Sequence, residues 1–96
     1  MSTRDAYKQK MEAELDLAQA KVGELRARAK GLAADARIGL GRQVDGLEKD
    51  IDAAKGRLRD LGAAGEDAWE GLKGGIDGAW DKLSTAVRDA VAKAEQ

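Results

Sequence analysis

Apolar residues in the first two thirds of the chain recur at steps of three and four. A heptad pattern, typical of a helix seam, covers Met11, Leu15, Ala18, Val22, Leu25, Ala29 and Leu32. Steps of four follow at Ala36, Leu40 and Val44, and the heptad resumes at Leu47, Ile51, Ala54, Leu58 and Leu61. We interpret the steps of four as a stutter, where a left-handed supercoil relaxes. Because no proline interrupts this spacing, it predicts one long helix over about residues 3–61.

Two short segments mark where helices begin and end. Ser2-Thr3-Arg4-Asp5 has the form of a capping box, which predicts a helix start near Thr3. Gly62-Ala63-Ala64-Gly65 is a plausible hinge, with a glycine after the first helix and acidic residues following. Helical spacing nevertheless continues from Leu61 through Gly65 to Leu72. The sequence therefore leaves open a bend or hairpin near 62–65 and one continuous helical rod.

The last third of the chain contains an 11-residue repeat. Ala68-Trp69-Glu70-Gly71-Leu72-Lys73 recurs as Ala79-Trp80-Asp81-Lys82-Leu83-Ser84. Eleven residues make three turns of a nearly straight helix, so the repeat keeps one apolar face. Within about 100° of arc lie Trp69, Leu72, Ile76, Trp80, Leu83, Val87 and Val91. This predicts a shorter amphipathic helix over about residues 66–94, whose tryptophans either anchor a partner or lipid surface or form core.

Together these patterns predict an all-α protein of coiled-coil type with a single domain, residues 1–96. Six glycines lie off the seam of the first helix, and each costs up to about 1 kcal/mol relative to alanine; they are Gly23, Gly31, Gly39, Gly41, Gly46 and Gly56. These glycines indicate either built-in flexibility or drift on a solvated face. In both cases packing must stabilise the helix.

A second copy of the chain is the expected packing partner. The shorter helix covers only about half of a helix of about 58 residues, because each residue adds about 1.5 Å to either. We therefore predict a homo-oligomer formed through the helical seam. Its interface residues are predicted to be Leu25, Leu32, Leu47, Ile51, Leu58, Leu61, Trp69, Leu72, Ile76, Trp80, Leu83 and Val87.

Composition excludes several function classes. The chain has no His and no Cys, which removes the usual general base, the thiol nucleophile and the common zinc ligands. With 17 basic and 18 acidic residues the net charge is −1, which disfavours nucleic acid as a partner. We predict no enzyme activity, no small-molecule substrate, no cofactor and no metal site. The basic residues Arg26, Arg28 and Lys30 are interpreted as a solvated face and not as a phosphate site. The acidic residues Asp45, Glu48 and Asp52 could bind a hard cation weakly, but they lack EF-hand spacing and are set aside as a metal site.

The chain resembles a family of small bacterial coiled-coil proteins described as stress-response proteins. The resemblance lies in the opening Ser2-Thr3-Arg4-Asp5-Ala6-Tyr7, in the charged heptad middle, and most specifically in the paired tryptophan repeat from Gly65 to Leu83. The chain differs by its glycines, where the family tends to have Ala, Glu or Lys. The resemblance implies a cytoplasmic helical protein linked to stress, with no catalytic residues.

Two functions remain open at this point. The first is a non-enzymatic, self-associating coiled-coil protein with a stress-linked structural or interaction role. The second is an amphipathic, surface-active protein that coats membranes, granules or unfolding proteins, since lipid-surface proteins also use 11-residue repeats. No targeting segment and no apolar run long enough to span a membrane is visible in the sequence, and we expect a cytoplasmic location.

Overall fold

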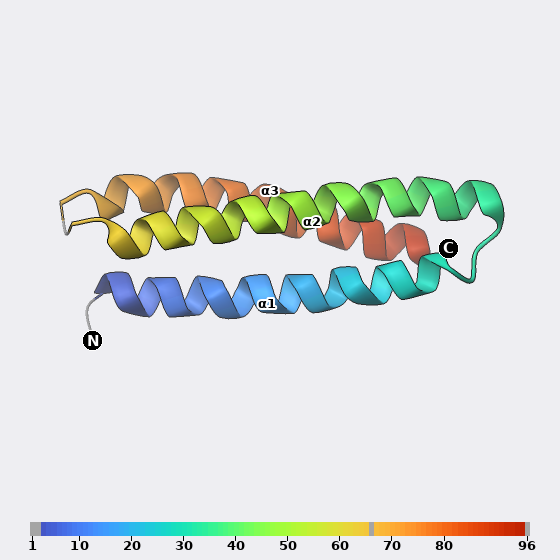
Figure 1. Cartoon of the computed structure of the whole chain (residues 1–96), viewed down its shortest axis with the longest axis horizontal. Helices are drawn as coiled ribbons and strands as arrows, with labels where there is room; N and C mark the ends of the chain where they lie inside the picture. Colours follow the sequence, from blue (N-terminus) through green and yellow to red (C-terminus); the bar gives the residue numbers. More distant parts are fainter. Residues whose placement is uncertain (1–2, 66, 96) are drawn as a thin grey trace.

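The computed structural model describes residues 3–65 and 67–95, and within them the chain forms three α-helices. These are α1 (Thr3–Ala29), α2 (Ala34–Ala63) and α3 (Trp69–Ala94). The helices pack side by side with α1 and α3 running one way and α2 the other, in a bundle of 51 × 19 × 17 Å (Figure 1). The predicted all-α class is confirmed. Ser2 of the expected capping box and Glu66, the expected start of the last helix, lie outside the described residues.

The single helix expected over residues 3–61 is instead two helices. Helix α1 ends at Ala29, where the amides of Gly31 and Leu32 donate to the carbonyls of Arg28 and Ala29, closing tight three-residue turns. Ala33 is extended, with φ −59° and ψ 155°, and the next helix starts after it. The steps of four in the apolar pattern thus coincide with a reversal of the chain. The chain reverses here without a proline. Gly31 is a poor helix former, and the reversal allows the apolar stripes of α1 and α2 to bury each other.

The core consists of the apolar stripe of each helix. From α1 it takes Met11, Leu15, Ala18, Val22, Leu25 and Ala29, which are the heptad positions of the sequence pattern. From α2 it takes Leu40, Val44, Leu47, Ile51, Ala54, Leu58 and Leu61. From α3 it takes Trp69, Ile76, Leu83, Val87 and Ala90. None of the described polar side chains is buried, so the core is a narrow apolar seam at the centre of one chain.

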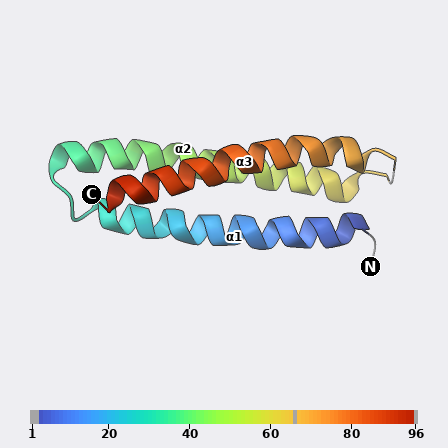
Figure 2. The same cartoon turned by 180° about the vertical axis from the view of Figure 1, so that it is seen from behind.

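The second turn separates α2 from α3. Helix α2 ends at Ala63, Ala64 is extended, and the amides of Ala68 and Trp69 donate to the carbonyl of Gly65. The guanidinium of Arg4, at the start of α1, donates to the carbonyl of Ala64 and so joins this turn to the N-terminal end. Seen from behind, α3 lies alongside α1 and crosses α2, and its C-terminal end lies next to the turn between α1 and α2 (Figure 2).

Candidate interaction surface

Most of the side chains predicted to form an interface pack within one chain. At most 9% of the surface of each remains exposed. The nine such residues are Leu25, Leu47, Ile51, Leu58, Leu61, Trp69, Ile76, Leu83 and Val87. The reason for expecting a second copy at this seam was that one short helix cannot cover a long one. That reason no longer applies, because three helices of 27, 30 and 26 residues cover one another.

The other three predicted residues lie at the edge of the core. Leu32 and Trp80 are half-buried and pack against it, whereas Leu72 is 40% exposed. The apolar arc of α3 is wider than the strip that α1 and α2 cover. Residues at the middle of this arc are therefore buried, and residues at its margins reach the surface.

Tyr7 of α1 fixes the beginning of α3. Its hydroxyl donates to Oδ1 of Asp77 at 2.5 Å, and its ring lies 6.3 Å from that of Trp69, centroid to centroid. Nζ of Lys73 lies 5.4 Å from the centroid of the Tyr7 ring, within the range of a cation–π contact. This aromatic corner, made of Tyr7, Trp69, Lys73 and Asp77, was not predicted, because its residues are up to 70 positions apart.

The aromatic corner also changes the acidity of Tyr7. Burial raises the pKa of the phenol above its ordinary value, because the phenolate would lose hydration, and the nearby carboxylate of Asp77 raises it further. Tyr7 therefore stays protonated and remains a hydrogen-bond donor well above neutral pH. The protonated hydroxyl of Tyr7 can therefore serve as a structural link between α1 and α3.

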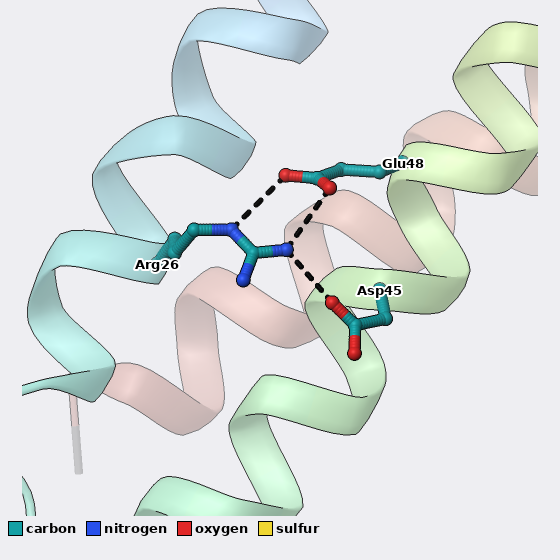
Figure 3. A network of polar contacts seen from close by, with 3 residues as sticks. All are labelled: Arg26, Asp45 and Glu48. Carbon is teal, nitrogen blue, oxygen red and sulfur yellow. Dashed lines mark hydrogen bonds and ion pairs between the residues drawn. The ribbon is translucent and has the colours of Figure 1, made fainter.

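A charged network joins α1 to α2 (Figure 3). Arg26 of α1 donates through Nε to Glu48 at 3.1 Å and through Nη2 to Asp45 at 2.8 Å, and Nη2 also lies 2.9 Å from the second oxygen of Glu48. Both carboxylates come from α2. Arg26 was interpreted as part of a solvated face, and the two acidic residues as a weak cation site that was set aside. Arg26 and Asp45 are exposed and Glu48 is half-buried, and the chain reversal at residues 30–33 brings the three together.

Further along the same pair of helices, Lys55 of α2 links back to α1. Its Nζ donates to the side-chain oxygen of Gln19 and lies 3.9 Å from Oδ1 of Asp16. Helix α3 has fewer such ties. Besides the aromatic corner, Arg57 of α2 donates to the carbonyl of Gly75 at 3.5 Å. No hydrogen bond or ion pair within the described residues joins residues 78–94 of α3 to the other helices.

One outer face of the closed bundle combines apolar side chains with an open groove. Leu17 of α1 is 66% exposed, the highest value among the large apolar residues described. Beside it, α1 and α3 form a groove of about 300 Å³, lined by Glu14, Leu17, Ala18, Lys21, Trp80, Ser84, Val87 and Arg88. The sequence pattern missed this face because Leu17 lies off the heptad stripe. It is the surface best suited to contact another molecule, because large apolar groups are accessible there without opening the core.

Three further observations concern other kinds of site and other proteins. Within the described residues, no group of three His, Cys, Asp or Glu side chains is placed to hold a metal ion. None of the helices described has an apolar stretch of the length that crossing a membrane requires. No family model, no curated protein and no solved structure matches the chain.

Proposed function

We propose that the protein is a non-enzymatic, self-associating helical protein of coiled-coil type with a stress-linked structural or interaction role in the cytoplasm. The stress link and the location rest on the family resemblance. The self-association rests on the outer face of α1 and α3, where Leu17 is 66% exposed next to the half-buried Trp80. This is the observation that carries the proposal.

The distribution of polar groups supports an interaction role. The well-placed polar contacts of the bundle, those of Tyr7, Arg26 and Lys55, join one helix to another. They serve to hold the bundle in shape. The apolar groups left at the surface are then available for a partner, and burying them is favourable by about 25 cal/mol for each Å² removed from water.

Sedimentation equilibrium at several protein concentrations tests the self-association. We expect the average mass to rise above that of one 10.2 kDa chain between about 10 µM and about 1 mM, the range of a weak protein–protein contact. A chain that stays monomeric throughout this range contradicts the proposal. The stress link is tested separately, by comparing survival of the source organism with and without the gene after heat or salt shock.

A second candidate function is surface activity, in which α3 leaves the bundle and lies on a lipid or protein surface. Two observations favour it: residues 78–94 have no polar tie to α1 or α2 among the described residues, and both tryptophans lie on the apolar side of α3. Opening would expose the apolar face that the 11-residue repeat maintains.

Tryptophan fluorescence distinguishes this second function from the first. If α3 opens onto lipid, anionic vesicles change the wavelength and intensity of the emission, because both indoles leave the bundle for the interface. If the bundle stays closed, vesicles leave the spectrum unchanged. A zwitterionic vesicle of the same size serves as the control for electrostatic attraction.

A further inference from the structure

The outer face of α1 carries a second heptad series, separate from the core stripe. It contains Lys10, Glu14, Leu17, Lys21 and Glu24, spaced four, three, four and three residues apart. Such residues lie along one side of a helix. Glu14 is half-buried beside the groove, and the other four are exposed. None of the four charged residues forms an ion pair or hydrogen bond within the part of the chain that the structure describes.

The order of charges in this series is self-complementary. Seven residues before Leu17 is Lys10 and seven after it is Glu24; three before is Glu14 and four after is Lys21. If two copies of α1 lie antiparallel with their Leu17 side chains opposite, every lysine faces a glutamate. If the copies lie parallel, every charge faces its own kind, which is unfavourable.

We propose that a second copy of this chain binds the outer face of α1, across a two-fold axis perpendicular to α1 at Leu17. In this dimer Lys10 pairs with Glu24 of the other copy, and Glu14 pairs with Lys21 of the other copy. Two-fold symmetry makes each pair occur twice. The inference rests on the self-association proposed above and gives it a surface other than the buried seam.

The groove between α1 and α3 suits this arrangement. It begins at Leu17 and is bordered by Trp80, so the Leu17 side chain of each copy lies beside a concavity of about 300 Å³ on the other, whose lining residues are half apolar and half polar. The face offers less to a lipid surface, because Glu14 and Glu24 would have to leave water without a partner. A net charge of −1 leaves little repulsion between two copies.

The size of the face predicts a weak dimer. Residues 10–24 of α1, which are symmetric about Leu17, extend over about 21 Å, and two neighbouring helices give a face about 20 Å wide. Each copy then buries up to about 420 Å², or about 840 Å² for the pair, which is the size of a weak, transient contact. The four charge pairs are accessible to solvent, so they decide orientation more than affinity.

Sedimentation equilibrium of charge-reversed variants tests the arrangement. Lys21→Glu places a like charge opposite Glu14 at both symmetric positions, so we expect dimerisation to weaken at least about tenfold in about 50 mM NaCl. The double variant Glu14→Lys with Lys21→Glu exchanges the charges and restores the pairing, so its dimerisation constant should return to within about threefold of the original. Raising NaCl to about 0.5 M should shrink the difference between the variants.

Matched controls keep the result interpretable. Lys49→Glu makes the same change of charge on an exposed residue of α2, and it should leave dimerisation unchanged. Leu17→Gln should abolish the dimer, whereas Ile38→Gln, at a residue that is 53% exposed on α2, should not. Circular dichroism of each variant verifies that the bundle is folded.

The outcomes separate this inference from the proposed function. If neither Lys21→Glu nor Leu17→Gln weakens dimerisation, the proposed surface is wrong, but self-association is still supported. A Lys21→Glu defect that the double variant does not repair overturns the antiparallel pairing. A chain that is monomeric at every concentration and salt overturns both.

Discussion

The α1–α2 hairpin and helix α3 are held in the bundle by different means. The hairpin is joined by charged side chains at two places along its length, at Arg26 near the turn and at Lys55 further along. Helix α3 has both tryptophans, and its polar ties to the other helices within the described residues lie in its first half, at Lys73, Gly75 and Asp77. Solvent-accessible charged contacts therefore join α1 to α2 along the hairpin, whereas docking of α3 depends on apolar burial and on one aromatic corner.

The largest effect should come from removing the apolar anchor of α3. Trp69 is 9% exposed and packs against Tyr7, so we expect Trp69→Ala to lower the free energy of unfolding by about 3–5 kcal/mol. Urea unfolding followed by circular dichroism measures this. Leu72→Ala, at a residue that is 40% exposed on the same helix, is the control and should cost about 1 kcal/mol. Equal effects would show that docking of α3 does not depend on its buried anchor.

Next in size is the polar tie in the same corner. Tyr7→Phe keeps the ring against Trp69 but removes the hydrogen bond to Asp77, and should cost about 1 kcal/mol at pH 7. The pKa of Tyr7 is raised in the folded chain, so its stabilisation is fully present below the unfolded value near 10 and is lost as pH rises beyond it. The difference in Tm between the original chain and Tyr7→Phe should accordingly shrink between pH 8 and pH 11. A constant difference would argue against this hydrogen bond.

A smaller and opposite effect is expected from glycines in α3. A Cβ added at Gly74 or Gly78 would meet no atom within 4 Å, so alanine fits there without strain. Each substitution should stabilise the protein by up to about 1 kcal/mol, because alanine loses less backbone entropy in a helix. Gly62→Ala is the comparison: its Cβ would lie 3.0 Å from Cε of Lys8, so that side chain must move and the gain should be smaller. Thermal unfolding gives the ranking.

The smallest effect concerns the charged network of the hairpin. Arg26→Gln removes contacts to Asp45 and Glu48 that are open to solvent, so Tm should fall by less than it does for Tyr7→Phe. At about 0.5 M NaCl the loss should disappear, because salt screens exposed charges. A loss as large as that of Tyr7→Phe would mean that these solvent-accessible contacts stabilise the hairpin as much as the aromatic corner stabilises α3.

The sequence allowed the helical class and the core positions of the hairpin to be predicted, because heptad spacing depends only on helix geometry. Each stripe residue from Met11 to Ala29 is buried as that spacing implies. The chain reversal at residues 30–33 was missed, since Gly31 is one of six similar glycines and the spacing of a seam is the same within one chain and between two. The partner of a stripe is a tertiary property that periodicity does not contain.

The surface features were harder to predict for the same reason. Tyr7 and Asp77 meet only because two chain reversals bring the beginning of α3 back to the beginning of α1. Trp69 and Trp80 occupy equivalent places in the repeat, yet the first is buried and the second half-buried. The difference arises from where α1 and α2 lie around α3, which the repeat itself does not encode.

Because the described residues form an odd number of helices, the bundle has a net helix dipole. Each helix has about half a positive charge at its N-terminal end and half a negative charge at its C-terminal end. With α1 and α3 parallel and α2 opposed, one such dipole stays uncancelled along the 51 Å axis of the bundle. Two bundles side by side in the same direction would repel at both ends, whereas an antiparallel pair cancels the dipole. The topology of a single chain thus favours the same orientation as the charges around Leu17, most strongly at low ionic strength.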